Sequence, residues 1–74
     1  MRPLYVIAKE IQKDWLKPNF GAVPYLKAMF YLSGINDMYY SDSAREIVIR
    51  FLCNAGTWRG ETARRIKKEL KELI

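Results

Sequence analysis

Residues 57–74, TWRGETARRIKKELKELI, decide the fold because apolar and charged residues recur there at helical spacing. On a helix that advances about 100° per residue, one face is apolar and consists of Ala63, Ile66, Leu70 and Leu73. A second face is purely basic and consists of Arg64, Lys67, Lys68 and Lys71. A third face alternates in charge through Glu61, Arg65 and Glu69, where each i, i+4 pair is worth about 0.2–0.5 kcal/mol. The segment is therefore predicted to form a helix with one buried, one positive and one neutralised side.

The composition is that of one small, densely packed domain. Of the 74 residues, 50% are hydrophobic and 14% are aromatic. A disordered chain would be poor in aromatic and branched aliphatic residues, so we expect residues 1–74 to form a single helical domain. Cys53 is the one cysteine, which excludes an intramolecular disulfide and a cysteine-based zinc site. A single thiol without disulfides is typical of the reducing cytoplasm.

Charge and hydropathy bear on location and partners. Lys9 and Glu10 interrupt the first apolar stretch, where a signal peptide would need an unbroken run. No window of the sequence reaches the roughly 20 apolar residues of a transmembrane helix, so we expect a soluble cytoplasmic protein with no membrane partner. Thirteen Lys and Arg against eight Asp and Glu give a net charge of +5. This balance favours long-range attraction to polyanions without identifying one.

Three further helices are predicted, over residues 3–16, 22–33 and 43–55. Their inner faces are Leu4, Ile7, Ala8, Ile11 and Trp15 in the first; Tyr25, Ala28, Met29 and Leu32 in the second; and Ala44, Ile47, Val48, Phe51, Leu52 and Ala55 in the third. Residues 35–43 read as a connector with an apolar plug, Met38-Tyr39-Tyr40, and no strand pair is expected. The pattern predicts an all-α fold, a compact four-helix bundle with short connections.

Turn-forming residues set the expected helix ends. Gly34 and Gly56 are predicted to end the second and third helices, since glycine readily adopts the left-handed conformation there. Ser41 or Asp42 is the expected N-cap of the third helix, and Thr57 is that of the fourth.

The predicted third helix carries an apolar pair on the side opposite its inner face. Ile49 and Cys53 lie four residues apart, among Arg45, Glu46 and Arg50. Such a pair needs a cover. Either the third helix is central and packs on two sides, or the pair belongs to a dimer or partner surface.

The chain is poorly equipped for catalysis. It has no histidine, the commonest general base and metal ligand. Cys53 has no activating base and lies in the middle of a predicted helix, away from the helix N-terminus at which reactive thiols are often found. The four glycines stand apart and form no phosphate-binding loop. We therefore expect no enzyme: no catalytic, cofactor-binding or metal-ligating residue is predicted, no cofactor is implied, and no small-molecule substrate is evident.

Nucleic-acid binding is only weakly indicated. The third and fourth predicted helices and the turn between them resemble a helix-turn-helix in outline. Aligning Gly56 with the turn glycine places Thr62 at a buried position, while aligning Gly60 demands a helix that runs through Gly56. The basic face could still contact phosphates without sequence specificity. A solvated charged surface explains it as well, although its like-charge i, i+4 pairs destabilise the helix slightly and would gain a purpose from an acidic partner.

Trp58 and Arg59 precede the basic face, and Trp58 has two interpretations. It either fills the corner between the third and fourth helices or is an exposed anchor of the kind that dominates interfaces.

Two segments resemble small proteins encoded in phages and integrative elements of Gram-positive bacteria, a group without an assigned activity. They are NFGAVPYLKAM, residues 19–29, and NAGTWRGETARRIKKELKEL, residues 54–73. The resemblance implies a mobile-element context, in which small proteins commonly bind host or element macromolecules.

Two functions remain open. The favoured one is a protein-interaction module, with a homodimer as one form of it, that uses either the Ile49 and Cys53 face or the surface from Trp58 to Lys71. Its candidate apolar interface residues are Ile49, Cys53 and Trp58. The alternative is a nucleic-acid-binding accessory protein that uses Arg59, Arg64, Lys67, Lys68 and Lys71. The excess of apolar and aromatic residues favours the first function. The second is less favoured, because the sequence shows no pattern of side chains suited to contact bases.

Overall fold

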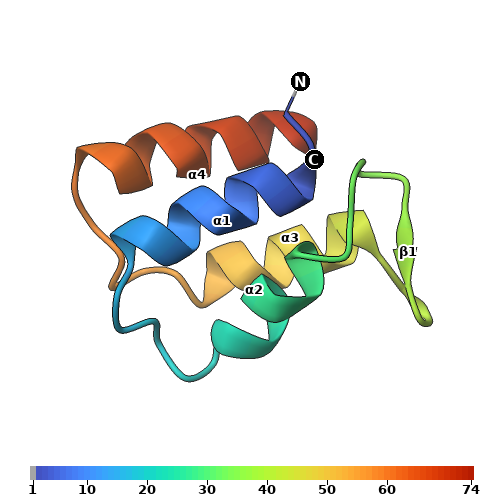
Figure 1. Ribbon diagram of the computed structural model, residues 1–74, viewed down its shortest axis with the longest axis horizontal. Coiled ribbons are helices and arrows are strands. Elements are labelled where there is room, and N and C mark those ends of the chain that lie inside the picture. Colours follow the sequence, from blue (N-terminus) through green and yellow to red (C-terminus); the bar gives the residue numbers. More distant parts are fainter. Residues whose placement is uncertain (1) are drawn as a thin grey trace.

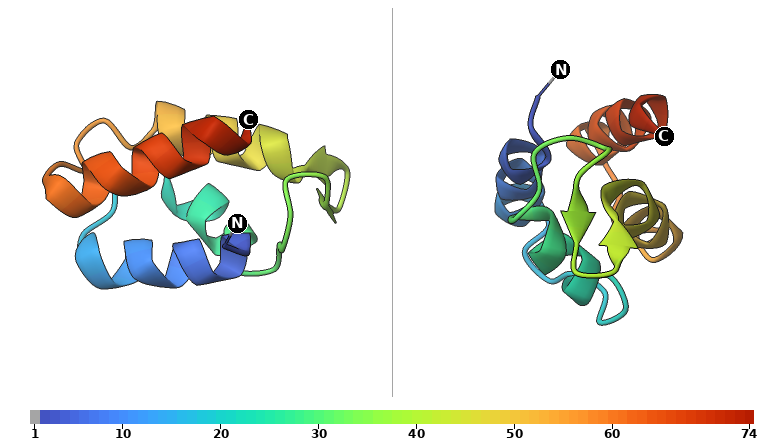
Figure 2. Two further views of the ribbon diagram at one scale, coloured as in Figure 1. Left: turned by 90° about the horizontal axis from the view of Figure 1, so that it is seen from above. Right: turned by 90° about the vertical axis from the view of Figure 1, so that its right-hand side faces the viewer.

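The computed structural model describes residues 2–74, which form four helices and one short two-stranded sheet (Figure 1). The helices are α1 (Leu4–Asp14), α2 (Val23–Met29), α3 (Ala44–Cys53) and α4 (Glu61–Leu73). The strands β1 (Met38–Tyr39) and β2 (Asp42–Ser43) pair in antiparallel fashion, with Tyr39 opposite Asp42. Helices α1 and α4 lie side by side and run in opposite directions, and the hairpin projects at one end of the molecule (Figures 1 and 2).

The mainly helical, compact fold is confirmed, whereas the regular four-helix bundle is not. Helix α2 has only 7 residues and packs mainly on α3, while α1 packs on both α2 and α4. The β1–β2 hairpin was not predicted, because residues 35–43 lack the Asn-Gly or Gly-rich turn that usually indicates a hairpin.

The core is built from the apolar faces that helical spacing predicts. The fully covered side chains on the helices are Leu4, Ile7, Ala8 and Ile11 of α1, Ala28 and Met29 of α2, Ala44, Val48 and Phe51 of α3, and Ala63, Ile66 and Leu70 of α4. Leu73, predicted to share the inner face of α4, packs against this core and is half-buried.

Three aromatic side chains join α1, α3 and the loop before α4. The rings of Trp15 and Trp58 stack with centroids 5.6 Å apart and an interplanar angle of 8°. Phe51 packs edge-on against both indoles, at 6.2 and 6.3 Å. The Trp58 indole N–H donates a hydrogen bond to Asp14 Oδ2 at 2.8 Å. Trp58 is 2% exposed and fills the helix corner, so its alternative interpretation as an exposed anchor is wrong.

Helix α2 ends four residues before the predicted boundary at residue 33. The amides of Phe30, Tyr31 and Leu32 each bond to the carbonyl three residues earlier, which is the tighter 3₁₀ pattern. The carbonyls of Leu32 and Ser33 then accept hydrogen bonds from the Tyr5 and Leu4 amides, at 2.9 and 2.8 Å. This turn therefore satisfies donors at the start of α1, where no side chain caps the helix.

Both ends of α3 also differ from the prediction. Ser43, and not Ser41 or Asp42, is the N-cap, and its hydroxyl accepts a hydrogen bond from the Glu46 amide at 3.2 Å. The helix ends at Cys53, before Gly56, because the Asn54 side chain donates to the Arg50 carbonyl and occupies an acceptor at the helix end.

Helix α4 begins at Glu61, so the prediction that Thr57 caps it is wrong. The N-cap is Gly60, with φ 114° and ψ 179°, a conformation that is essentially restricted to glycine. Residues 57–60 instead form the loop that carries Trp58 into the core. Gly60 is thus the residue that lets the chain turn from the buried Trp58 into α4.

We expect Gly60→Ala to lower the free energy of unfolding by about 1–3 kcal/mol, because a Cβ is strained in this conformation. Gly56→Ala is the matched control: Gly56 has no positive φ and no atom within 4 Å of an added Cβ. Urea unfolding followed by tryptophan fluorescence measures both. Equal effects of the two substitutions would show that Gly60 is not required for the turn.

Candidate functional site

Three adjoining hollows form a continuous depression along α1, α2 and the hairpin, which we call the aromatic trough. The middle hollow, of about 470 Å³, is lined by Gln12, Lys27, Phe30, Tyr31 and Tyr39. It shares Tyr31 and Tyr39 with a hollow of about 360 Å³ that Met38 and Tyr40 complete. It shares Gln12, Lys27 and Phe30 with a hollow of about 210 Å³ that Trp15, Leu16, Pro18, Val23 and Leu26 complete.

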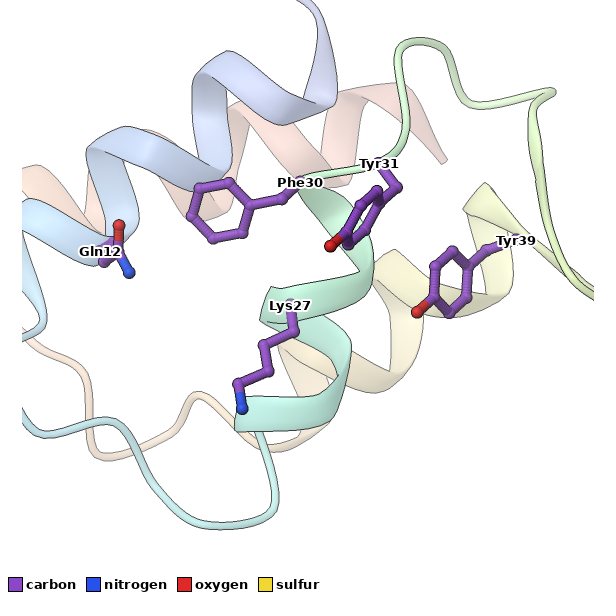
Figure 3. A pocket seen from close by; sticks show the side chains of 5 residues that line it. All are labelled: Gln12, Lys27, Phe30, Tyr31 and Tyr39. Carbon is purple, nitrogen blue, oxygen red and sulfur yellow. The ribbon is translucent and has the colours of Figure 1, made fainter.

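Figure 3 shows how three elements build the middle hollow. Lys27 projects from α2, and Phe30 and Tyr31 project from the turn that follows it. Gln12 on α1 lies on one side of them and Tyr39 on β1 lies on the other. The Tyr31 and Tyr39 rings are tilted against each other with centroids 6.0 Å apart.

Large apolar side chains around the trough are open to solvent. Tyr31 is 77% exposed, Met38 60%, Tyr40 87% and Leu16 81%. The prediction that residues 38–40 form an apolar plug is therefore wrong for two of the three, since only Tyr39 packs partly against the core. Contiguous exposed apolar surface of this kind marks interaction sites in folded proteins.

The hairpin presents Tyr40 in an unfavourable backbone conformation. Tyr40 is the first residue of the two-residue loop between β1 and β2, and its φ is 56°. Glycine is the usual residue where the first position of such a loop has positive φ, and a bulky side chain there is strained. The Tyr40 ring makes an edge-on contact with Tyr39, with centroids 4.8 Å apart, and the residue is 87% exposed. Intramolecular packing therefore gives a weak reason for tyrosine at this position.

Hydrogen bonds to the side chain and the carbonyl of Asp37 hold the base of the hairpin. Asp37 Oδ2 accepts from the amides of Ser33 and Gly34, at 2.9 and 3.0 Å. These two bonds, that of Gly34 first, lower the pKa of the Asp37 carboxyl. The Asp37 carbonyl accepts from the Ala44 amide at 2.7 Å, so the two arms of the hairpin are joined at their base. The hairpin is thus fixed relative to Tyr31.

The predicted basic face of α4 is largely accessible. Arg59, Arg64, Lys68 and Lys71 are exposed. Lys67 is half-buried, and its ammonium donates to the Trp58 carbonyl at 2.6 Å and lies 5.9 Å from the Trp58 ring centroid. Within residues 2–74, none of these five cations forms an ion pair. Burial, followed by repulsion from Lys71 and Arg59, lowers the pKa of Lys67.

Two residues of the third face of α4 pair outside their own helix, one with Glu10 of α1 and one with Arg2, which precedes α1. Glu69 pairs with Arg2 at 2.6 Å, Arg2 pairs with Glu10 at 2.8 Å, and Arg65 also pairs with Glu10. The predicted pairs within α4 among Glu61, Arg65 and Glu69 do not form: Arg65 and Glu69 pair outside the helix, and Glu61 has no ion pair within residues 2–74. Hydrogen bonds from Arg65 and then Arg2 lower the pKa of Glu10, and that from Arg2 lowers the pKa of Glu69.

The Ile49–Cys53 pair lies at the surface. Ile49 is 36% exposed and Cys53 is exposed. The interpretation of α3 as a central helix covered on two sides is therefore wrong, since only the face with Ile47, Val48 and Phe51 is buried. Neither member of the pair lines one of the hollows described above, so it is a smaller candidate surface than the trough.

Searches of known protein families, curated proteins and solved structures return no match to the chain. Within residues 2–74, no helix is long and apolar enough to cross a membrane. The same part of the chain holds no cluster of three or more His, Cys, Asp or Glu suited to a metal ion. The resemblance to phage and integrative-element proteins stays a prediction.

The ion pairs of Arg2 with Glu10 of α1 and Glu69 of α4 predict a pH dependence. Glu10 and Glu69 have pKa values below their usual 4.5 in the folded protein, so they stabilise it above about pH 4.5 and lose that contribution as the pH falls through the lowered values. Arg2→Gln should lower the free energy of unfolding by about 1 kcal/mol at neutral pH, a small amount because the pairs are partly exposed. In this variant the free energy of unfolding should also decrease less as the pH falls below about 4.5.

Urea unfolding at neutral and acidic pH measures this effect. Lys68→Gln removes the same charge from an exposed, unpaired position of α4 and is the control. An equal pH dependence in the two variants would contradict a stabilising role for the Arg2 pairs.

The strained hairpin predicts a variant that stabilises the fold. We expect Tyr40→Gly to raise the free energy of unfolding by about 0.5–1 kcal/mol, because relief of the positive φ outweighs the added freedom of the unfolded chain. Tyr31→Ser, at an exposed position without positive φ, should give no gain. Thermal unfolding followed by circular dichroism compares the two. A lower midpoint for Tyr40→Gly would show that the ring stabilises the hairpin.

Proposed function

We propose that the protein is a small, non-enzymatic helical protein-interaction module whose binding surface is the aromatic trough. The observation that carries this proposal is Tyr40, which is 87% exposed at a strained position beside Met38 and Tyr31. A residue that destabilises the fold and makes few contacts within its own molecule is expected at a position where it contacts a partner. Tyrosine is also among the residues that dominate binding energy at protein interfaces.

The trough is a better interface than the surface predicted from sequence. Trp58, one of the three residues in that prediction, is in the core. Ile49 and Cys53 remain accessible as an isolated pair, whereas the trough combines several exposed aromatic side chains with hollows that can receive a partner's side chains. Buried anchors in such hollows provide most of the affinity of protein complexes.

Self-association is one form of this function, and a mobile-element protein of the bacterial cytoplasm is the context that the resemblance and the single free thiol favour. A homodimer would cover the trough of one subunit with that of another. The net charge of +5 does not oppose this arrangement strongly, because Lys27 is the one charged residue among those that line the trough.

Nucleic-acid binding by α4 is the second candidate. The supporting observation is the absence of ion pairs for Arg59, Arg64, Lys67, Lys68 and Lys71 within residues 2–74. Phosphate contacts could neutralise this face. The Trp58 ring, which lies beside Lys67 of this face, is buried and offers no platform on which a base could stack. Binding would then be electrostatic and strongly salt-dependent.

Capture experiments with three variants separate these functions. We expect the immobilised wild-type protein to retain a defined protein from a Gram-positive lysate, and the double variant Tyr31→Ser/Tyr40→Gly to lose it. Lys68→Ser/Lys71→Ser and Ile49→Ser are controls that should retain it. The captured protein is then purified and titrated by calorimetry, where the Tyr31/Tyr40 variant should bind at least about tenfold more weakly.

Sedimentation of the wild-type protein alone measures self-association in the same variants. A dimer abolished by Tyr31→Ser/Tyr40→Gly would identify the partner as a second copy. Retention of nucleic acid that is lost at moderate salt and in Lys68→Ser/Lys71→Ser, with no effect of the Tyr31/Tyr40 variant, would reject the interaction module in favour of nucleic-acid binding. Loss of the partner in Ile49→Ser alone would move the interface to α3.

A further inference from the structure

The three hollows of the aromatic trough have a fixed order of chemistry. One end is apolar, with Leu16 and Val23, and the other end is aromatic, with Met38 and Tyr40. The one charged group, Lys27, lines both the middle hollow and the hollow at Leu16, and it does not line the hollow at Tyr40. The three hollows lie in this order because the middle hollow shares lining residues with the hollow at each end. A ligand that fills the trough would therefore place one group at a cation and apolar groups on both sides of it.

Lys27 has no anionic neighbour in the trough. No acidic residue lines any of the three hollows, and Lys27 forms no ion pair within residues 2–74. Both carboxylates of α1 are engaged on another flank: Glu10 pairs with Arg2 and Arg65, and Asp14 accepts from the Trp58 indole. The Asp37 carboxylate is held by backbone amides.

The neighbouring groups also suit an anion. The Gln12 amide and the Tyr31 and Tyr39 hydroxyls form no hydrogen bond among those the structure shows for residues 2–74, and each can donate one to a carboxylate. A cationic ligand would meet no opposite charge here.

A polypeptide fits this arrangement better than a nucleic acid. The trough has one cation, whereas a bound strand brings a phosphate with every nucleotide and needs a basic groove along its backbone. The concentrated basic face is on α4, which packs against α1 and α3 and contributes no residue to the hollows. A single carboxylate between apolar side chains matches one lysine between apolar hollows.

We propose that the aromatic trough binds an acidic linear segment of a partner protein, in which an Asp or Glu that pairs with Lys27 is flanked on both sides by bulky apolar side chains. This inference rests on the proposed function and adds the chemistry of the partner to it. The apolar side chains occupy the hollows at Leu16 and at Met38 and Tyr40. The carboxylate accepts from Lys27 and fixes the register of the segment.

Selection from a random peptide library tests this specificity. Peptides of about 12 residues are selected separately on the wild-type protein, on Lys27→Glu and on Lys68→Glu, and the enriched peptides are titrated by fluorescence anisotropy. The wild-type protein and Lys68→Glu should select Asp or Glu between aromatic or aliphatic residues. Lys27→Glu should bind those peptides at least about tenfold more weakly and should select Lys or Arg at the same position. Lys27 is exposed, and circular dichroism checks that each variant is folded.

The outcomes separate this inference from the proposed function. Peptides that bind with equal affinity to the wild-type protein and to Lys27→Glu, but at least about tenfold more weakly to Tyr31→Ser, would overturn the acidic partner and keep the trough as the interface. Peptides insensitive to both Lys27→Glu and Tyr31→Ser would overturn both. Tighter binding of a single-stranded oligothymidine than of any peptide, lost in Lys27→Glu, would assign the trough to nucleic acid and also overturn the inference.

Discussion

The stacked indoles of Trp15 and Trp58 are the contact on which the rest of the structure depends. Large aromatic side chains contribute most to a small core, and this pair joins the end of α1 to the loop that precedes α4, with Phe51 of α3 against both rings. Burial of Trp58 requires the chain to turn sharply at Gly60 before α4 begins. Helix α4 is thereby laid along α1, where Arg2 and Glu10 meet its charged side chains.

This arrangement decides which surfaces are left for a partner. One flank of α1 is occupied by ion pairs and by the bond from Trp58 to Asp14, so its carboxylates are unavailable elsewhere. The flank that faces α2 keeps Gln12, and the chain after α2 tightens in order to supply carbonyls to the start of α1. That tightening leaves Tyr31 outside the core, next to the hairpin that Asp37 holds in place. The aromatic trough is thus a consequence of how the helix ends are satisfied.

Helical periodicity predicted most of the buried positions of each helix, because burial of an apolar stripe is a property of a whole segment. The exceptions are Tyr25, Leu52 and Leu73, which pack against the core and are half-buried. The helix ends were predicted poorly: Thr57 is a good N-cap by residue type, but the need to bury Trp58 moves the start of α4 to Gly60. The trough was missed for a related reason. An apolar run such as Met38-Tyr39-Tyr40 is typical of a core, but in the structure Met38 and Tyr40 are exposed and Tyr40 has a positive φ. The basic face of α4 could be predicted from sequence, because charge periodicity needs no tertiary information. The hydrogen bond from the Lys67 ammonium to the Trp58 carbonyl could not, because it depends on where the loop before α4 is placed.

The central claim is that partners bind at the aromatic trough and not at α4 or at the exposed side of α3. Hydrogen–deuterium exchange of the protein, with and without a partner recovered by capture, tests it most directly because it reports every segment at once. The account predicts slower exchange over residues 27–32 and 37–43, with α4 unchanged. Slower exchange confined to residues 57–74, or to the segment around Ile49 and Cys53, would contradict it.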